Sequence, residues 1–178
     1  MKLYVIRHGR TNCNKEHKYN GRYDEDINEE GIEQAKLASN EIKELDIDLI
    51  ICSPLKRTRH TMEIINVNNV PVIYDDGLME RDCGKLTLTE IDDFYYKEYY
   101  NYYSTEYVEG LETMPQLLKR VHSFLDRIKE EYKDKNILLV THGAVARAMY
   151  FYFEKMPSDG KLLNIGGMKN CEIREHEL

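Results

Sequence analysis

The sequence lacks several features that would place it in a special class of protein. Its four cysteines are scattered, with no CxxC pair and no histidine nearby at metal-ligand spacing, so we expect reduced thiols and neither a disulfide framework nor a zinc site. No apolar run approaches the roughly 20 residues that a membrane-spanning helix needs. The apolar start, MKLYVIRHG, meets charge too soon for a signal peptide. We therefore expect a cytoplasmic protein with no membrane partner.

An excess of positive charge is missing as well. The chain carries 25 lysines and arginines against 32 acidic residues, a net charge of −7. Nucleic-acid-binding proteins usually present a basic face, so we expect no nucleic-acid partner. Internal repeats and low-complexity linkers are also absent. With 178 residues, of which 42% are hydrophobic, the chain is long enough for its own core, and we predict a single domain over residues 1–178.

Short apolar runs alternate with amphipathic segments along the chain. We predict strands at residues 3–6, 48–52, 71–74 and 136–140, of which the first two are buried and the fourth is unbroken and apolar, and an edge strand at 170–175. Helices are predicted after Asn28, which can cap the first of them, after Pro54, and over residues 112–132 and 144–153. Strands that are apolar throughout and alternate with helices are typical of a parallel sheet covered on both faces. The predicted fold is therefore α/β, a three-layer α/β/α sandwich with a mainly parallel sheet.

Three of the predicted strands run directly into charged or polar residues. The first is followed by Arg7-His8-Gly9, the second by a segment that reaches Arg57, and the fourth by His142-Gly143. Ligands of open α/β sheets bind at the carboxyl ends of the strands. We therefore expect two histidines and two arginines to share one site.

These residue types suit the transfer of a phosphoryl group. A neutral imidazole is a nucleophile toward phosphorus, and arginine matches phosphate oxygens two at a time. Glu80, after an apolar pair, is the best-placed acid to protonate the leaving oxygen, although a loop acid can also be merely solvated. Each histidine or arginine alone could be structural. A zinc site on His8 and His142 has no further ligand at suitable spacing, and the arginines would repel a cation.

Segments in five parts of the chain resemble the motifs of one family, the histidine phosphatase superfamily in its phosphoglycerate-mutase-like branch. A lone RHG would be weak evidence, but the matches come in the family's order and span almost the whole chain. They are Arg7-His8-Gly9-Arg10-Thr11 with Asn14, the stretch from Tyr19 to Ala35, Ser53-Pro54-Leu55-Lys56-Arg57-Thr58, Leu78-Met79-Glu80, and Thr141-His142-Gly143 with Arg147.

The resemblance implies roles for the matching positions. His8 would be the phosphorylated nucleophile, and Glu80 the general acid that later activates water. Arg7, Arg57 and His142 would hold the phosphoryl oxygens. The remaining residues of the predicted phosphate and substrate site are Thr11, Asn14, Asn20, Gly21, Gly143 and Arg10. The resemblance implies a small phosphorylated metabolite as substrate and no metal or organic cofactor. The protein would be a small phosphatase similar to broad-specificity or alpha-ribazole phosphatases, as a monomer or homodimer.

Departures from the family pattern keep other interpretations open. Arg10 stands where the family usually has Glu or Gln, and it could bind a second anionic group or turn outward to pair with Glu16 or Glu29. Mutases carry paired arginines in an inserted segment, whereas this chain has no arginine between Arg81 and Arg120. A phosphatase is therefore favoured over a phosphoglycerate mutase. A non-catalytic phosphate-binding regulatory protein is the alternative from another class.

The segment after Glu80 is expected to form a short helical cap over about residues 80–111. Within it, residues 94–107 read FYYKEYYNYYSTEY, and on a helix Tyr95, Tyr99 and Tyr102 or Tyr103 would share a face. Tyrosines offer a large amphipathic contact area. They could stack on a substrate or simply pack the cap onto the body of the protein.

Overall fold

A five-stranded sheet forms the centre of the computed structural model, which describes residues 1–178 apart from the side chain of Phe94. The strand order is β3-β2-β4-β1-β5. Strands β1 to β4 are parallel, and β5 runs antiparallel to β1 at one edge. The bounds are Lys2–Arg7 for β1, Leu49–Cys52 for β2, Val72–Tyr74 for β3, Ile137–Thr141 for β4 and Ile173–Glu177 for β5. The mainly parallel sheet and its edge strand are confirmed.

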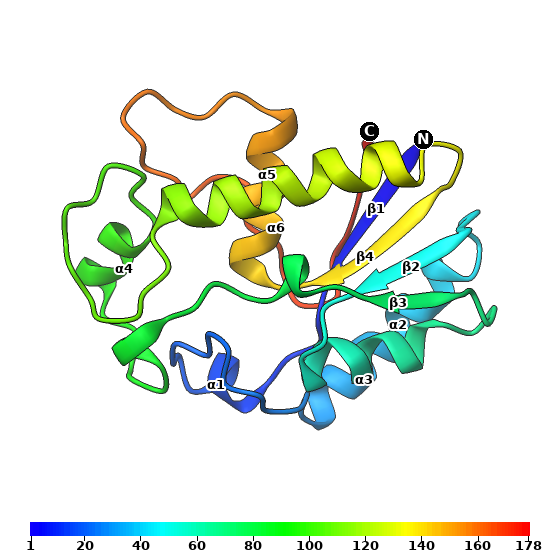
Figure 1. Ribbon diagram of the computed structural model, residues 1–178. Coiled ribbons are helices and arrows are strands. Elements are labelled where there is room, and N and C mark those ends of the chain that lie inside the picture. Colours follow the sequence, from blue (N-terminus) through cyan, green and yellow to red (C-terminus); the bar gives the residue numbers. More distant parts are fainter.

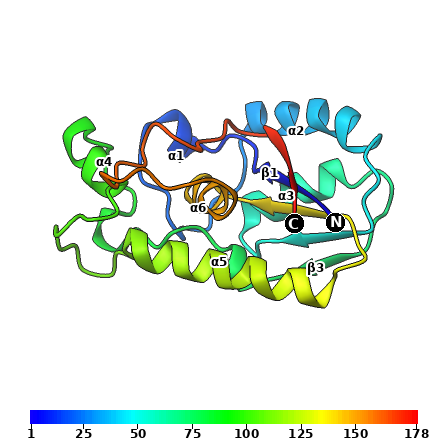
Figure 2. The same cartoon turned by 90° about the horizontal axis from the view of Figure 1, so that it is seen from above.

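Helices cover both faces of the sheet and give the predicted three layers (Figures 1 and 2). Alternate side chains of a strand point to opposite faces, so the sheet supports two cores. One core joins the sheet to α5 (Met114–Glu131) and α6 (Gly143–Phe153). The other joins it to α2 (Glu29–Ile42) and α3 (Lys56–Ile65). Within the described residues, no helix is both long enough and apolar enough to span a membrane.

The long helices begin where their capping residues lie. The Asn28 side chain accepts a hydrogen bond from the Gly31 amide, as predicted for the start of α2. Thr113 and Gln116 form a reciprocal capping box at the start of α5. Such caps are worth about 1 kcal/mol each. A four-residue helix, α1 (Asn12–Lys15), was not predicted, because so short a helix shows no periodicity.

The segment predicted as the cap lies beyond the carboxyl ends of the parallel strands (Figure 1). Single turns of 3-10 helix occur just before it at Asp76–Leu78 and inside it at Gly84–Leu86, and α4 covers Asp93–Tyr99. Because α4 ends at Tyr99, the expected helical face from Tyr95 to Tyr102 or Tyr103 does not form. The Tyr102 amide instead donates to the Gly160 carbonyl, in the segment that precedes β5.

Candidate active site

The register of the sheet brings the predicted strand exits together. Arg7 at the end of β1 is paired with Thr141 at the end of β4, and Cys52 at the end of β2 is paired with Val140. The residues that follow these ends therefore meet at one edge of the sheet. The rings of His8 and His142 lie with their centroids 5.2 Å apart.

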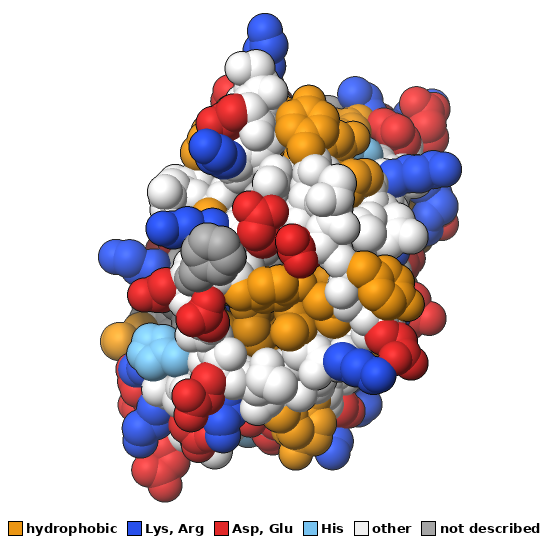
Figure 3. Space-filling view, turned by 90° about the vertical axis from the view of Figure 1, so that its left-hand side faces the viewer, with side chains coloured by type: hydrophobic (Ala, Val, Ile, Leu, Met, Phe, Trp, Pro, Cys, Tyr) orange, Lys and Arg blue, Asp and Glu red, His pale blue; other side chains and the backbone are white. Residues whose placement is uncertain are grey.

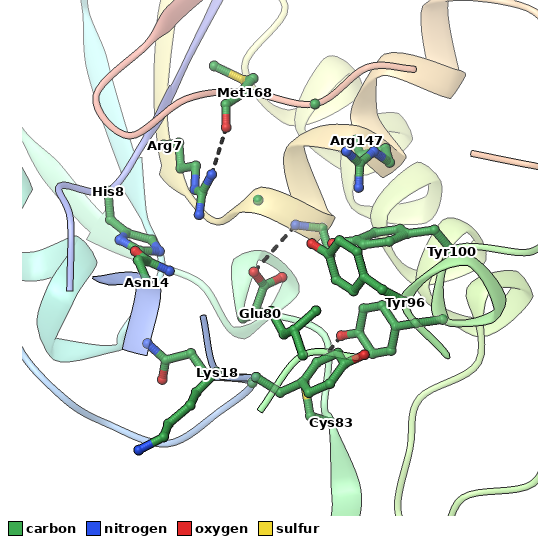
Figure 4. A pocket seen from close by; sticks show the side chains of 18 of the residues that line it. Arg7, His8, Asn14, Lys18, Glu80, Cys83, Tyr96, Tyr100, Arg147 and Met168 are labelled. Atoms are coloured by element: carbon green, nitrogen blue, oxygen red, sulfur yellow. Dashed lines mark hydrogen bonds between the residues drawn. The ribbon is translucent and has the colours of Figure 1, made fainter. Parts of the chain in front are cut away.

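A cavity of about 400 Å³ opens at this edge and lies between the sheet, α6 and the cap segment (Figure 4). Its volume suits a small metabolite. Eight of the predicted site residues line it, namely Arg7, His8, Asn14, Asn20, Gly21, Arg57, Glu80 and Gly143. Thr11, Arg10 and His142 are not among the lining residues.

The His8 ring is held in one tautomer. Its Nδ1 lies 2.7 Å from the Gly9 carbonyl oxygen, which can only accept, so Nδ1 carries the proton and Nε2 keeps its lone pair. The residue is 3% exposed. Burial, and then the charges of Arg57 and Arg7, hold the pKa of His8 well below its usual value. The imidazole is therefore neutral and carries a free nitrogen.

Arg7 is anchored at one end of its guanidinium group. Nη1 donates to the Met168 carbonyl at 2.7 Å, and the buried Nε has no hydrogen-bond partner among the described residues. A β-carbon on Gly143 would lie 3.3 Å from the Arg7 Cζ, so glycine lets the start of α6 approach the guanidinium closely. Figure 4 shows Arg7 beside His8 at the cavity wall.

Arg57 and His142 form a buried pair behind His8. Arg57 Nε donates to His142 Nδ1 at 3.2 Å, and Arg57 Nη2 donates to the Gly21 carbonyl at 2.7 Å. Since arginine only donates, His142 must carry its proton on Nε2, which lies 2.7 Å from the Ser53 hydroxyl. Burial, followed by the Arg57 charge, holds the pKa of His142 well below its usual value.

The place of His142 differs from the prediction that it holds a phosphoryl oxygen directly. Both of its ring nitrogens are engaged within the protein, and it does not line the cavity. In this structure it orients Arg57 and packs against the His8 ring.

The Glu80 carboxylate reaches the cavity from the loop after the turn at Asp76–Leu78. One oxygen accepts from the Arg81 amide at 2.8 Å, and the other accepts from the Ala144 amide at 3.3 Å, in the first turn of α6 (Figure 4). These two bonds orient the carboxyl group toward the side of the cavity that holds Arg7 and His8.

The loop after β1 forms the floor of the site. Thr11 caps α1 in a reciprocal box with Asn14, so both residues have a structural role, and of the two only Asn14 lines the cavity. The amide of Asn20 donates to the Glu25 carboxylate at 2.8 Å. Gly21 has a φ of +52°, a conformation that favours glycine, and a β-carbon there would lie 2.9 Å from that of Cys83.

Arg10 does not line the central cavity but an adjoining hollow that shares Arg7 and Asn14 with it. Its Nη1 lies 2.7 Å from a carboxylate oxygen of Glu30 in α2. The outward ion pair, expected with Glu16 or Glu29, therefore forms with Glu30, because Glu30 lies in the first turn of α2 beside the loop that carries Arg10. The assignment of Arg10 to the phosphate site is not supported by this geometry.

Several lining residues were absent from the predicted site. Arg147 lies one helical turn after Gly143, and this spacing from a glycine already in the site was a usable signal. Tyr96, Tyr99 and Tyr100 form one wall, and Tyr99 and Tyr100 are also buried against the body, so these tyrosines both pack and face the cavity. Further lining residues are Lys18, Met168, Lys169 and Glu172. Among the described side chains, no three His, Cys, Asp or Glu residues cluster as a metal site would require.

The strand ends of a mainly parallel sheet surround a neutral, buried imidazole with guanidinium groups. This arrangement is typical of an enzyme that acts on phosphate esters through histidine. The family model of the histidine phosphatase superfamily (branch 1) matches residues 3–177. The chain belongs to this superfamily, whose members act through a phosphohistidine intermediate, and it is a phosphatase of that superfamily.

Similar proteins in sequence and structure carry both phosphatase and mutase names. Phosphoserine phosphatase 1 of Hydrogenobacter thermophilus is 31% identical over 157 residues, which cover 84% of this chain and 74% of the relative. The probable phosphoglycerate mutase GpmB of Shigella dysenteriae is 32% identical over 152 residues, covering 80% of this chain and 70% of the relative. The structure of the alpha-ribazole phosphatase of Shigella flexneri superposes with a TM-score of 0.82 at 25% identity, covering 98% of this chain and 89% of the other.

Proposed function

We propose that this chain is a metal-independent phosphatase that hydrolyses small phosphate monoesters in the cytoplasm through a phosphohistidine on His8. The observation that carries the proposal is the hydrogen bond from His8 Nδ1 to the Gly9 carbonyl, because it leaves a neutral Nε2 as the nucleophile beside two guanidinium groups. The four cysteines of the chain are all free thiols, and this supports the proposed location because the cytoplasm is a reducing compartment.

The first step transfers the phosphoryl group to the protein. His8 Nε2 attacks phosphorus, the bond from phosphorus to the ester oxygen breaks, and the Glu80 carboxylic acid gives its proton to the leaving oxygen. Charge develops on the equatorial oxygens in this step. Arg7 binds them with the part of its guanidinium that is not held by Met168. Arg57, held by His142 and two backbone carbonyls, adds a fixed positive charge.

The second step returns His8 to its starting state. The Glu80 carboxylate takes a proton from water, the water oxygen attacks phosphorus, and the bond from phosphorus to Nε2 breaks. Inorganic phosphate leaves and neutral His8 is restored, so the two steps balance. Glu80 is suited to both roles because the Arg81 and Ala144 amides fix its carboxyl group at the cavity wall.

Hydrolysis is favoured over the mutase reaction by the residues around the cavity. The chain has no arginine between Arg81 and Arg120, so the paired arginines expected of a mutase are missing, and Ala144 stands where mutases have Asn. Incubation with 3-phosphoglycerate separates the two reactions. A phosphatase releases inorganic phosphate and glycerate, whereas a mutase forms 2-phosphoglycerate.

The test of the proposal is hydrolysis of p-nitrophenyl phosphate with EDTA present. The wild-type protein should keep its rate in EDTA, and His8→Ala should lose about 10³-fold or more, as expected for a nucleophile. His60→Ala is the matched control, because His60 pairs with Asp26 on the surface and should keep its rate. Quenching in alkaline SDS during turnover should trap labelled phosphate on the wild-type protein and on His60→Ala but not on His8→Ala, because the P–N bond of phosphohistidine survives base and hydrolyses in acid. Full activity in His8→Ala, or loss of activity in EDTA, would refute the proposal.

A further inference from the structure

The guanidinium group of Arg147 lies in the wall of the central cavity, beyond the residues assigned to phosphate. Gly143, Ala144 and Arg147 line the cavity from the same side of α6, as expected for residues three and four positions apart on a helix. Gly143 packs against Arg7, so Arg147 lies one helical turn farther from the phosphate end. Figure 4 shows Arg147 beside Tyr100, with Arg7 on the other side of the start of α6.

Arg147 is a buried cation whose terminal nitrogens are unused. The residue is 9% exposed, and its Nε donates to the Ile165 carbonyl at 2.9 Å. Neither terminal nitrogen has a hydrogen-bond partner or an ion pair among the described residues. Neither atom is among the water-excluded side-chain atoms that lack a partner, so both face the open cavity. The Tyr100 ring, centred 4.1 Å from the guanidinium carbon, covers one side of the group.

Arg81 shows what a structural arginine looks like in the same protein. It also lies over a tyrosine ring, that of Tyr99, at 3.9 Å. However, Arg81 donates to the carbonyls of Glu112 and Tyr99 and to the sulfur of Met114, and it does not line the cavity. Arg147 makes the same aromatic contact but keeps its two-nitrogen edge available to a ligand.

We propose that Arg147 binds a second anionic group, a carboxylate or a phosphate, on the same substrate. This inference rests on the proposed function, which places the ester phosphate at His8. A guanidinium edge binds such groups with two parallel hydrogen bonds. Four residues of helix rise about 6 Å. The substrates favoured are therefore short phosphate monoesters whose second anionic group lies a few bonds from the ester oxygen.

Gly167 offers a way to disturb Arg147 without removing its charge. A β-carbon on Gly167 would lie 2.7 Å from Arg147 Nη2, and this glycine does not adopt the left-handed conformation. Gly167→Ala should therefore displace the guanidinium end while leaving the backbone unstrained.

The test measures kcat/KM for matched pairs of substrates. The first pair is 3-phosphoglycerate and glycerol 3-phosphate, which differ in a carboxylate. The second is 1,3-propanediol bisphosphate and 3-hydroxypropyl phosphate, which differ in a phosphate. In the wild type, the substrate with the second anion should be preferred in at least one pair, and that pair identifies the group. Arg147→Met should lower this preference by about 10- to 100-fold, because hydrogen bonds to a charged group contribute a binding free energy of that size.

Gly167→Ala should lower the same preference to a smaller extent. Arg127→Met should leave it unchanged, because Arg127 stacks on Phe124 and pairs with Asp75 outside the cavity. A loss of stability would lower the rates for both members of a pair and would not change their ratio. No preference in the wild type, or a preference that survives in Arg147→Met, would overturn the inference. Absence of all turnover by the wild type would instead refute the proposed function.

Discussion

At the scale of single residues, the two site histidines are kept neutral by their surroundings. His8 and His142 are buried, and each lies close to the Arg57 guanidinium group, so the pKa of each is held well below its usual value. A neutral His8 is needed for nucleophilic attack. The same property links the stability of the fold to pH.

Stability should fall as the pH drops below about 6.5, the pKa of histidine in an unfolded chain. Because the folded pKa values are lower, the unfolded state binds protons that the folded state does not. The stabilisation is complete above pH 6.5 and is lost toward the folded pKa values. Each buried histidine contributes a slope of about 1.4 kcal/mol per pH unit.

Urea denaturation between pH 7 and pH 5 would measure this slope. In the variant His8→Asn, the slope of the unfolding free energy with pH should be smaller by the contribution of one histidine, roughly 1.4 kcal/mol per pH unit. An unchanged slope in that variant would mean that His8 is not held neutral in the folded protein.

The position of a residue can be predicted from the sequence where the path of the backbone alone determines it. His8 and Gly143 lie within two residues of the end of an apolar strand, so their place at the sheet edge could be predicted. The direction of the Arg10 side chain could not, because it depends on how closely α2 approaches the loop after β1. The bond between His142 and Arg57 was equally hidden, because the two residues are 85 positions apart.

At the scale of elements, α2 is fixed to the end of β1 by contact between two glycines. A β-carbon on Gly31 would lie 2.3 Å from the Arg10 carbonyl oxygen, and one on Gly9 would lie 2.6 Å from the Gly31 carbonyl oxygen. Atoms of different elements do not approach so closely without strain. The missing side chains let the first turn of α2 support the loop that holds His8.

Gly31→Ala should therefore destabilise the protein by about 1–3 kcal/mol through overpacking. This is the reverse of the usual effect of alanine in a helix, where it is favoured by about 1 kcal/mol. It should also lower kcat, since the loop with His8 must shift. Asn40→Ala, at an exposed position of the same helix, should change stability by less than about 0.5 kcal/mol. Thermal and urea denaturation of both variants would measure these changes in stability. A Gly31→Ala variant more stable than the wild type would contradict the packing argument.

The predictability of the elements follows their length and patterning. The apolar strands are continuous hydrophobic runs, and helix α5 has a strong apolar periodicity, so all of them were predicted within a few residues of their bounds. Residues 154–172, which lack any helix or strand, show neither pattern. Yet that segment supplies the Met168 carbonyl to Arg7 and borders the cavity, so its part in the site could only be seen in three dimensions.

At the scale of the whole molecule, charge is distributed unevenly. The chain has a net charge of −7, yet the cavity lining holds five basic residues and only two acidic ones, Glu80 and Glu172. On the face that carries α4, hydrophobic side chains gather near the middle and charged side chains of both signs lie around them (Figure 3). The positive potential is therefore concentrated in the cavity, where it attracts an anionic substrate.

Salt should weaken this attraction. Between low salt and about 0.5 M NaCl, the KM for an anionic monoester should rise roughly 3- to 10-fold, with a smaller change in kcat. Lys169→Gln removes an exposed charge that lines the cavity and should reduce the salt dependence. Lys133→Gln removes an exposed charge in the turn between α5 and β4, away from the cavity, and should not. Steady-state kinetics over a salt series would test this, and equal salt dependence in both variants would count against it.

The strand order has a consequence for how the protein is made. β1 lies between β4 and β5, and both of these neighbours are encoded after every other strand. On a translating ribosome, the strand that leads into the nucleophile leaves the exit tunnel before the other strands of the sheet but has no partner until β4 and β5 emerge. Its apolar run, Leu3 to Ile6, must therefore stay unpaired or shielded during most of synthesis. Catalytic competence would be acquired in a single late event, when β4 and β5 close around it.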